Sequence, residues 1–297
     1  MKIGGKFKVF CNNLVVDEAT QKTISSRYKK ITQRLNKEFW SNNSLTKHSL
    51  YVGSYGRNTA VRGFSDLDIL FCLPSYIYEK YNNYTSNGQS ALLQAFKSSI
   101  QKTYSTTSIS GDGQVAVINF TDGIKFEIVP AFKNSDSSFT YPDSKNGGSW
   151  KETNPIPEIT TLRNNNTATN YNLVRLCRMT RAWRNKWNVK IGGLLIDTLA
   201  NQFLMQYKYK DKGYLYYDCI ARDFFLYLAN QRKSQLYWRA VGSNQYVYRK
   251  GPFEYKAKQC YKLAMEAIQL EKNNYVCLAN NKWREIYGSA YPNQSVS

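Results

Sequence analysis

Apolar side chains recur at helical spacing between residues 18 and 40. The segment contains neither proline nor glycine, and its apolar positions lie three or four residues apart. These positions are Ile24, Tyr28, Ile31, Leu35 and Phe39. Because one side of an α-helix repeats about every 3.6 residues, the pattern predicts one long amphipathic helix over 18–40.

Shorter apolar runs bounded by glycine, proline or aspartate follow this helix. A buried strand is predicted at 67–73, because the run is largely apolar and stops at Pro74. Two β-rich runs, 115–120 and 124–132, are joined by Thr-Asp-Gly, which is typical of a hairpin. The other expected elements are a short strand at 50–52, a glycine-containing turn at 53–56 and a helix at 91–103.

The composition changes at residues 133–170, which are rich in Asn, Ser, Gly and Pro. This composition predicts a long connection that holds the boundary between two lobes. From Tyr171 onward the helical spacing returns, first in an apolar stripe from Leu173 to Trp183. Further helices are expected around 194–204, 224–228 and 253–270.

The predicted fold is α+β. A mixed sheet with flanking helices and the long N-terminal helix forms a first domain, residues 1–160. A helical lobe forms the second domain, residues 161–297, and the N-terminal helix is expected to bridge both.

The composition narrows the chemistry. The single histidine, His48, argues against a Ser-His-Asp triad and a histidine-rich metal site, and its position predicts packing or exposure. Six cysteines without a C-x-x-C pair argue against a zinc ribbon or a disulfide framework, and predict reduced thiols in the cytoplasm. The N-terminus lacks the apolar core of a signal peptide, so none is predicted. The chain has no run of about 18 apolar residues, so no membrane span is predicted either.

The charge points to an anionic partner. The chain of 297 residues has 41 Lys and Arg against 21 Asp and Glu, which gives a formal net charge of +20. Such an excess attracts nucleic acid, nucleoside triphosphates or acidic lipid, although a lysine-rich soluble surface is the alternative. The basic residues are spread along the chain, which favours a basic cleft over a basic tail.

Candidate catalytic residues gather around one predicted strand. Asp66 and Asp68 lie two positions apart, so both carboxylates should face the same side of the strand. Adjacent carboxylates favour a hard divalent cation, Mg²⁺ above all. Upstream, Gly53 lets a phosphate approach the backbone and Ser54 offers a hydroxyl. Glu127 is a charge between apolar residues on a later strand, which predicts the third acid of a two-metal phosphoryl-transfer site.

Each signal has a simpler explanation when it stands alone. A lone D-x-D is usually a solvated turn, and a Glu in an apolar strand is more often an edge residue or the partner of a cation such as Lys125. The conjunction is more specific. A Gly-Ser pair, a D-x-D on an apolar strand twelve positions after Ser54, and an acid on a later strand together predict a nucleotidyltransferase.

These residues resemble the DNA polymerase β-type nucleotidyltransferase superfamily, and more narrowly the bacterial cGAS/DncV-like nucleotidyltransferases (CD-NTases, SMODS domain). GSYGRNTAVRGFSDLDILFCLP is similar to the family's metal motif, and FTDGIKFEIVPAF to its third-acid strand. The likeness continues through YPDSKNGGSW, LVRLCRMTRAWRNKW and NNKWREIYGSAYP, and so covers most of the chain. It implies a polymerase β-like core with a C-terminal helical lobe.

The resemblance also implies roles for individual residues. Asp66 and Asp68 would bind two Mg²⁺ ions, with Mn²⁺ as the alternative. Glu127 would complete the metal site and act as the base, although the family usually has Asp there. Gly53 and Ser54 would hold the β- and γ-phosphates of the donor triphosphate.

A cation from the helical lobe would also bind the triphosphate. Arg178 and Arg181 lie three positions apart on one predicted helix face, and both fit this role. The family often has a Ser on the next helix, where this chain has Gly192-Gly193. Tyr55 is the tyrosine nearest the motif and the candidate for stacking on a base, against the commoner role of packing.

The implied activity joins nucleoside triphosphates into a cyclic di- or trinucleotide second messenger, with release of pyrophosphate. The substrates would be ATP and GTP, with UTP or CTP as alternatives, and a separate effector would read the product in antiphage (CBASS) signalling. A template-independent RNA 3′-end nucleotidyltransferase would share the same site. A catalytically idle nucleic-acid-binding module is a further alternative, which three intact acids disfavour. Nucleic acid is compatible as a partner but not required, and no membrane partner is expected.

Overall fold

The computed structural model describes residues 3–63 and 66–293, so Phe64 and Ser65, which directly precede the D-x-D motif, lie outside the described residues. Contacts divide the chain into two compact units. The sheet unit is Asp17–Gly56 and Ser65–Pro155. The helical unit is Met1–Val16, Arg57–Phe64 and Ile156–Ser297.

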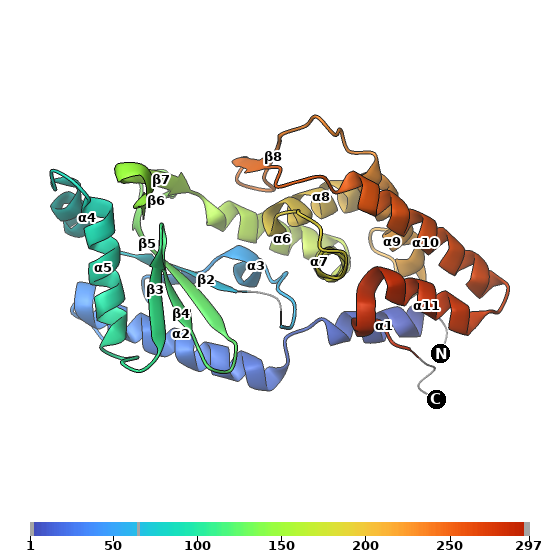
Figure 1. The fold of residues 1–297 in the computed structure, drawn as a ribbon, viewed down its shortest axis with the longest axis horizontal. Helices are drawn as coiled ribbons and strands as arrows, with labels where there is room; N and C mark the ends of the chain where they lie inside the picture. Colours follow the sequence, from blue (N-terminus) through green and yellow to red (C-terminus); the bar gives the residue numbers. More distant parts are fainter. Residues whose placement is uncertain (1–2, 64–65, 294–297) are drawn as a thin grey trace. The chain divides into compact units, whose positions relative to one another are not determined.

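A mixed sheet built from seven strands of the described residues forms the centre of the sheet unit (Figure 1). The strands are β1 (Ser49–Tyr51), β2 (Leu67–Cys72), β3 (Ser108–Asp112), β4 (Val115–Asn119), β5 (Lys125–Lys133), β6 (Phe139–Asp143) and β7 (Ser149–Thr153). Their order is β1-β2-β5-β4-β3, and β6 and β7 extend from β5 as a hairpin. β2 and β5 run parallel, and the remaining pairs of this order are antiparallel.

Two helices, α2 (Glu18–Phe39) and α5 (Gly88–Gln101), pack against the sheet through aromatic rings. The Phe96 ring of α5 lies 5.8 Å from Phe39 of α2 and 6.0 Å from Phe71 of β2. Phe71 and Phe96 are fully buried, so this face of β2 belongs to the core of the unit. Because side chains alternate along a strand, the neighbours of Phe71 in sequence point to the opposite face.

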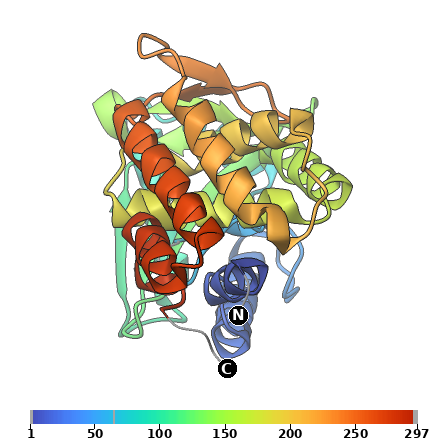
Figure 2. The same ribbon diagram turned by 90° about the vertical axis from the view of Figure 1, so that its right-hand side faces the viewer.

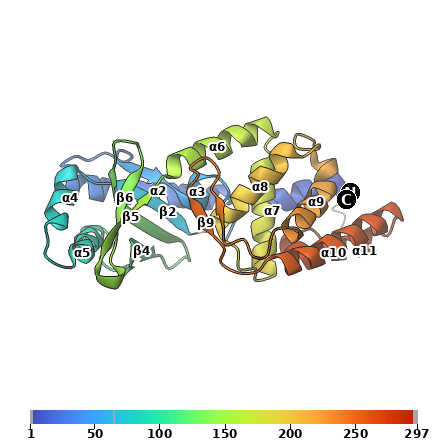
Figure 3. The ribbon, with the colours of Figure 1, turned by 90° about the horizontal axis from the view of Figure 1, so that it is seen from above.

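Two further helices belong to the sheet unit, α3 (Gly53–Gly56) and α4 (Ser75–Asn82). α4 lies beside α5 (Figures 1 and 3). The long helix α2 is capped at its N-terminus by Asp17, whose carboxylate accepts a 2.9 Å hydrogen bond from the Thr20 N–H. This N-cap satisfies a backbone donor that no earlier turn of the helix could pair.

The predicted α+β class, with its mixed sheet, flanking helices and long N-terminal helix, is confirmed. The predicted strand at 67–73 and the predicted hairpin at 115–132 also match β2, β4 and β5 within two residues. The long connection predicted for 133–170 is wrong, because this segment contains β6, β7 and the helix α6 (Pro155–Ala168). The polar composition conceals β7 in particular. None of its residues is buried, so its side chains show no alternation of apolar and polar positions.

The helical unit consists mainly of helices and one short hairpin. Its elements are α1 (Ile3–Asn13), α6, α7 (Asn172–Lys186), α8 (Gly193–Gln206), α9 (Tyr217–Ala229), β8 (Tyr237–Arg239), β9 (Tyr246–Tyr248), α10 (Glu254–Lys272) and α11 (Val276–Tyr287). Three 3₁₀ turns lie at Lys145–Gly147 in the sheet unit and at Tyr214–Tyr216 and Gly288–Ala290 in this one. α10 and α11 are neighbours in the structure (red, Figure 2).

Helix α1 is the element of the helical unit that the sequence conceals most. Two glycines interrupt its apolar spacing, yet its Phe7 and Phe10 side chains are fully buried. The Phe7 ring lies 5.1 Å from Trp283 and 5.4 Å from Tyr291, which come from the other end of the chain. Tertiary packing therefore stabilises a helix that local propensity does not predict.

The predicted domain boundary at residue 160 remains a prediction. By contacts, the sheet unit ends at Pro155, and the short segments Met1–Val16 and Arg57–Phe64 group with the helical unit. No helix within the described ranges, 3–63 and 66–293, is long and apolar enough to cross a membrane.

Candidate active site

The register of two parallel strands brings the predicted acids together. Asp68 on β2 is paired with Glu127 on β5, and Asp66 lies one residue before β2. Parallel strands are separated by about 4.8 Å, so the two paired carboxylates are neighbours on one face of the sheet. Asp68 and Phe71 point to opposite faces of β2 because they are three positions apart. Phe71 contacts α5, so the acids lie on the face of the sheet opposite to α5.

A lysine lies between two of these carboxylates. The Lys125 ammonium on β5 is 2.5 Å from Glu127 Oε1 and 3.3 Å from Asp66 Oδ2. Hydrogen bonds to Glu127 and then to Asp66 outweigh partial burial and raise the pKa of Lys125. The ion pair with Lys125 that the sequence suggested as the simpler explanation of Glu127 is therefore present, and it includes Asp66 as well.

The donor set fits a hard divalent cation. Carboxylate oxygens are the ligands that Mg²⁺ prefers, and the Lys125 ammonium shows that Asp66 and Glu127 converge on a single positive charge. Across the residues that the structure describes, no three His, Cys, Asp or Glu side chains are already gathered closely enough to hold a metal ion. A cation held by Asp66 and Glu127 together would take the place of the Lys125 ammonium.

Gly53 holds the backbone of the Gly-Ser motif against Asp68. Its φ of +58° lies in the left-handed region that favours glycine. A Cβ atom at this position would lie 1.8 Å from Asp68 Oδ2, so no larger residue fits without displacing the carboxylate. The Val52 N–H also donates a 2.9 Å hydrogen bond to the Asp68 carbonyl oxygen, which joins the end of β1 to the start of β2.

Ser54 and Tyr55 follow in α3 and are both half-buried. The Tyr55 ring lies 4.8 Å from the ring of Tyr51, which stacks in turn on Tyr28 of α2. Burial raises the pKa of Tyr55, so the phenol stays neutral. Tyr55 thus has the packing contacts that are the commoner alternative to a base-stacking role.

The two candidate arginines of α7 lie in different environments. Arg181 is buried and donates to both carboxylate oxygens of Asp197, at 2.6 and 2.9 Å, and to the Gly193 carbonyl oxygen. Arg178 is half-buried and donates to the Asn58 carbonyl oxygen and to Asn58 Oδ1, at 2.9 and 2.8 Å. The sequence could not choose between them. In the structure Arg181 is committed to a buried ion pair, whereas Arg178 donates to the uncharged Asn58.

A buried network of charged side chains surrounds Asp197, which the sequence patterns did not predict. Asp197 Oδ2 accepts hydrogen bonds from Arg57 Nε at 2.9 Å and from Thr59 Oγ1 at 3.0 Å, in addition to those from Arg181. Arg57 also contacts Glu158 of α6 at 3.2 Å. Burial opposes ionisation of Asp197, but Arg181 and Arg57 outweigh it and lower the pKa to about 2. The available signal was a lone Asp in the apolar run LLIDTLA.

The His48 side chain packs against neighbouring side chains of the sheet unit. Its ring stacks on Trp40 at 3.9 Å, and Nδ1 lies 2.7 Å from Asn36 Oδ1. Burial, followed by the nearby Lys47 charge, lowers the pKa of His48. The predicted packing role is confirmed.

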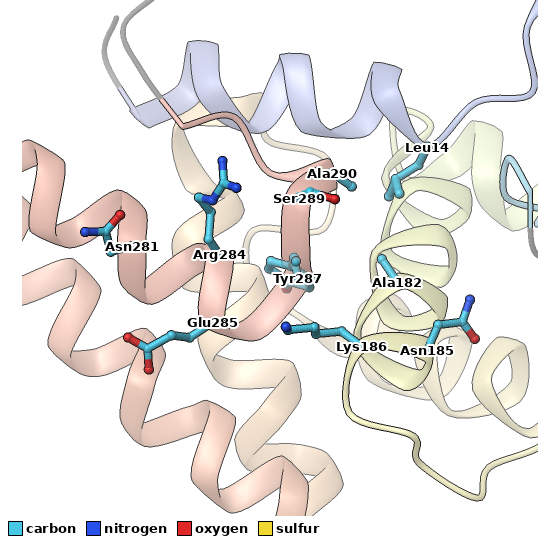
Figure 4. A pocket seen from close by; sticks show the side chains of 11 residues that line it. Leu14, Ala182, Asn185, Lys186, Asn281, Arg284, Glu285, Tyr287, Ser289 and Ala290 are labelled. Carbon is cyan, nitrogen blue, oxygen red and sulfur yellow. The ribbon is translucent and has the colours of Figure 1, made fainter.

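A cavity of about 660 Å³ in the helical unit contains none of the predicted site residues (Figure 4). Lys186 of α7 and Arg284 of α11 contribute its positive charges, and Glu285 contributes a negative one. Because the three acids belong to the sheet unit, this cavity is not the candidate site.

Comparisons with known proteins place this geometry in a family. Residues 1–166, more than half of the chain, match the model of the Second Messenger Oligonucleotide or Dinucleotide Synthetase domain, SMODS. No curated protein sequence matches the chain significantly.

Several solved structures share the fold over nearly their whole length. CdnC of E. coli MS115-1, in its complex with HORMA-deltaN, has a TM-score of 0.68 and 15% identity, over 98% of this chain and 98% of that one. CdnG of Bradyrhizobium diazoefficiens, in complex with GTP, has a TM-score of 0.69 and 9% identity, over 97% and 95%. The Vibrio cholerae di-nucleotide cyclase DncV has a TM-score of 0.65 and 12% identity, over 95% and 93%.

The family model covers both strands that carry the acids, and the structural likeness extends through the helical unit. The chain therefore belongs to the SMODS-domain family of cGAS/DncV-like nucleotidyltransferases, the CD-NTases, and is a nucleotidyltransferase.

Proposed function

We propose that this nucleotidyltransferase joins nucleoside triphosphates into a cyclic di- or trinucleotide second messenger and releases pyrophosphate. The observation that carries the proposal is the pairing of Asp68 with Glu127 on adjacent parallel strands, with Asp66 one residue before β2. Related structures support the substrate class: CdnC has been solved with ATP, CdnG with GTP, and DncV, a cyclic AMP-GMP synthase, with the linear intermediate pppA(3′,5′)pG.

In the proposed reaction, a ribose hydroxyl oxygen attacks the α-phosphorus of a bound triphosphate. A phosphodiester bond forms, the bond from the α-phosphorus to the bridging oxygen of the β-phosphate breaks, and pyrophosphate carries away the electron pair. Glu127 accepts the proton of the attacking hydroxyl. A second transfer of the same kind, after the linear intermediate turns around, would close the ring.

Asp66, Asp68 and Glu127 would hold Mg²⁺, or alternatively Mn²⁺, as two ions. When bound, these ions lower the pKa of the attacking hydroxyl and offset the charge of the leaving group. The Lys125 ammonium would leave Asp66 and Glu127 as the cations enter. Its four-carbon side chain is one-third exposed, which leaves it room to turn toward solvent.

Gly53 and Ser54 would bind the triphosphate through the backbone and the hydroxyl. Arg178 is our candidate for the cation from the helical unit, because Arg181 would leave Asp197 buried and partly unpaired if it turned to a ligand. The product would be read by a separate effector in antiphage (CBASS) signalling. A cytoplasmic location remains our expectation, and the six cysteines are free thiols in the structure.

The deciding experiment incubates the purified protein with the four nucleoside triphosphates and Mg²⁺ or Mn²⁺, and identifies the products by mass spectrometry. We expect small products that resist phosphatase, and none with a chelator or with the Asp68→Asn variant. Asp112→Asn is the matched control, because Asp112 is an exposed carboxylate on β3 of the same sheet. Both variants should unfold at the wild-type temperature to within a few degrees.

Two results would contradict the proposal. Product formation by a folded Asp68→Asn variant would reject the site. Elongation of added RNA, without small cyclic products, would reject cyclisation and favour an RNA 3′-end nucleotidyltransferase.

A further inference from the structure

The β8–β9 hairpin of the helical unit has an outward face made of three tyrosines and one arginine. In its antiparallel register Tyr237 pairs with Tyr248, and Arg239 pairs with Tyr246. The remaining pair, Trp238 with Val247, points the other way, and Trp238 is buried in the core of the unit. Because side chains alternate along a strand, the first four residues share the solvent face.

These rings are open to solvent and close to one another. Tyr248 is 64% exposed, and Tyr237 and Tyr246 are 47% and 48% exposed. The centroid of Tyr237 lies 4.7 Å from that of Tyr246 and 6.3 Å from that of Tyr248. Arg239 Cζ lies 3.9 Å from the centroid of Tyr246, and Arg239 Nη2 donates to the Tyr246 hydroxyl at 2.8 Å. Contiguous exposed rings of this kind mark a binding surface.

The charged residues of the hairpin segment itself are all positive. Residues 230–253 contain five Lys or Arg and no Asp or Glu. Arg249 is paired with Glu254 at 2.7 Å, just beyond this segment. The other four cations are exposed: Arg232, Lys233, Arg239 and Lys250. The complementary partner is therefore both planar and anionic.

We propose that Tyr237, Arg239, Tyr246 and Tyr248 bind single-stranded nucleic acid, with unpaired bases stacked on the tyrosines and phosphates beside the cations. Every nucleobase has a planar face, so stacking of this kind tolerates any sequence. A duplex hides those faces inside its base pairs and would use only the charge. The surface lies on an element that carries none of the catalytic candidates, so the proposal is separate from cyclic nucleotide synthesis.

The test measures binding of a fluorescent oligo-dT of about 12 nucleotides to the full-length protein by anisotropy. Replacing Tyr248 or Tyr237 by Ala should weaken binding by about 5-fold to 150-fold, whereas Tyr248→Phe keeps the ring and should bind as the wild type does. Tyr275→Ala is the matched control. Tyr275 is 59% exposed and lies beyond the far end of α10, a helix of 19 residues.

Two ligand controls separate stacking from charge. An abasic oligonucleotide of the same length keeps the phosphates but lacks the bases, and it should bind at least about 5-fold more weakly. A duplex of equal length should gain nothing from the tyrosines, so its affinity should be the same for the wild type and for Tyr248→Ala. Equal affinity for abasic and intact strands, or equal loss of duplex binding, would overturn the proposal.

Arg239 gives an independent readout. Arg239→Gln should lower the slope of log affinity against log salt by about 0.7, the value for one released counterion on a single strand, whereas Arg239→Lys should keep the slope. An unchanged slope in a folded Arg239→Gln variant would exclude a phosphate contact. If a tyrosine variant fails to fold, as judged by thermal unfolding, the abasic comparison on the wild-type protein decides the proposal.

Discussion

Gly53 and Lys125 are the single residues whose surroundings matter most for the candidate chemistry. Gly53 allows the Gly-Ser backbone to lie against the Asp68 carboxylate, and Lys125 places a positive charge between Asp66 and Glu127. Both arrangements depend on atoms that lie far apart in the sequence. Each therefore gives a test that a search for the D-x-D motif alone would not suggest.

Replacing Gly53 by Ala should abolish most of the activity. The new Cβ would meet Asp68 Oδ2 at 1.8 Å, and the φ of +58° is unfavourable for alanine. With the role proposed for Asp68, displacing its carboxylate should cost about 100-fold in rate, and the strained backbone costs about 1–2 kcal/mol of stability. Initial rates and thermal unfolding of the same samples separate the two effects.

Gly123→Ala is the matched control for this substitution. Gly123 also has a positive φ, +83°, but nothing lies within 4 Å of its Cβ position. It should therefore lose stability to a similar extent while keeping its activity. Equal activity in the two variants would show that Gly53 has no role in placing Asp68.

Helices α6, α7 and α8 meet at one buried carboxylate, that of Asp197. Arg181 comes from α7, Glu158 lies on α6, and Arg57 belongs to the segment just before the D-x-D motif. The network thus ties Arg57 and Thr59 to α6, α7 and α8 within the helical unit.

Asp197→Asn should destabilise the protein by about 3–5 kcal/mol, because it removes the countercharge of the buried Arg181 guanidinium and leaves Arg57 with Glu158 as its acidic partner. Denaturant unfolding measures the change in free energy. Glu285→Gln is the control, since the Glu285–Lys282 pair is half-exposed at 3.6 Å, and such pairs contribute about 0–1 kcal/mol. Equal stability of both variants would mean that the Asp197 network makes no net contribution to the free energy of unfolding.

In the molecule as a whole, each of the two units contains a carboxylate whose ionised form is favoured. A hydrogen bond from Lys151, followed by those from the Lys145 N–H and Gln114, lowers the pKa of Asp143 in the sheet unit to about 2. Asp197 in the helical unit has a similar pKa, for which Arg181 and Arg57 overcome the opposing effect of burial. Acid should therefore weaken both units in the same range of pH.

The expected pH dependence follows from the sign of these shifts. Both groups have a lower pKa in the folded protein than the ordinary value of 3.8, so they stabilise the fold above about pH 4. This contribution should disappear as the pH falls from about 4 to about 2. Urea unfolding across this range measures it, and Asp197→Asn should show a smaller loss. If Asp197→Asn left the dependence of the unfolding free energy on pH unchanged, the lowered pKa of Asp197 would be contradicted.

Much of the sheet unit could be predicted from the order of residues along the chain. The alternating and helical spacing of apolar residues located α2, β2 and the β4–β5 hairpin, because burial of one face repeats with the period of the element. The same spacing argument placed Asp66 and Asp68 on one face of a strand. The strand β7 could not be found in this way because none of its residues is buried, and helix α1 could not because its aromatic partners lie at the other end of the chain.

The primary sequence was sufficient to indicate the chemistry, because the acids and the Gly-Ser pair form a specific pattern and periodicity is a local property. Only the folded chain could decide which groups meet. It pairs Asp68 with Glu127, sets Lys125 between Asp66 and Glu127, and buries Arg181 while leaving Arg178 more accessible. The physical reason is that register, burial and charge pairing depend on residues far apart in sequence, whose proximity no local pattern records.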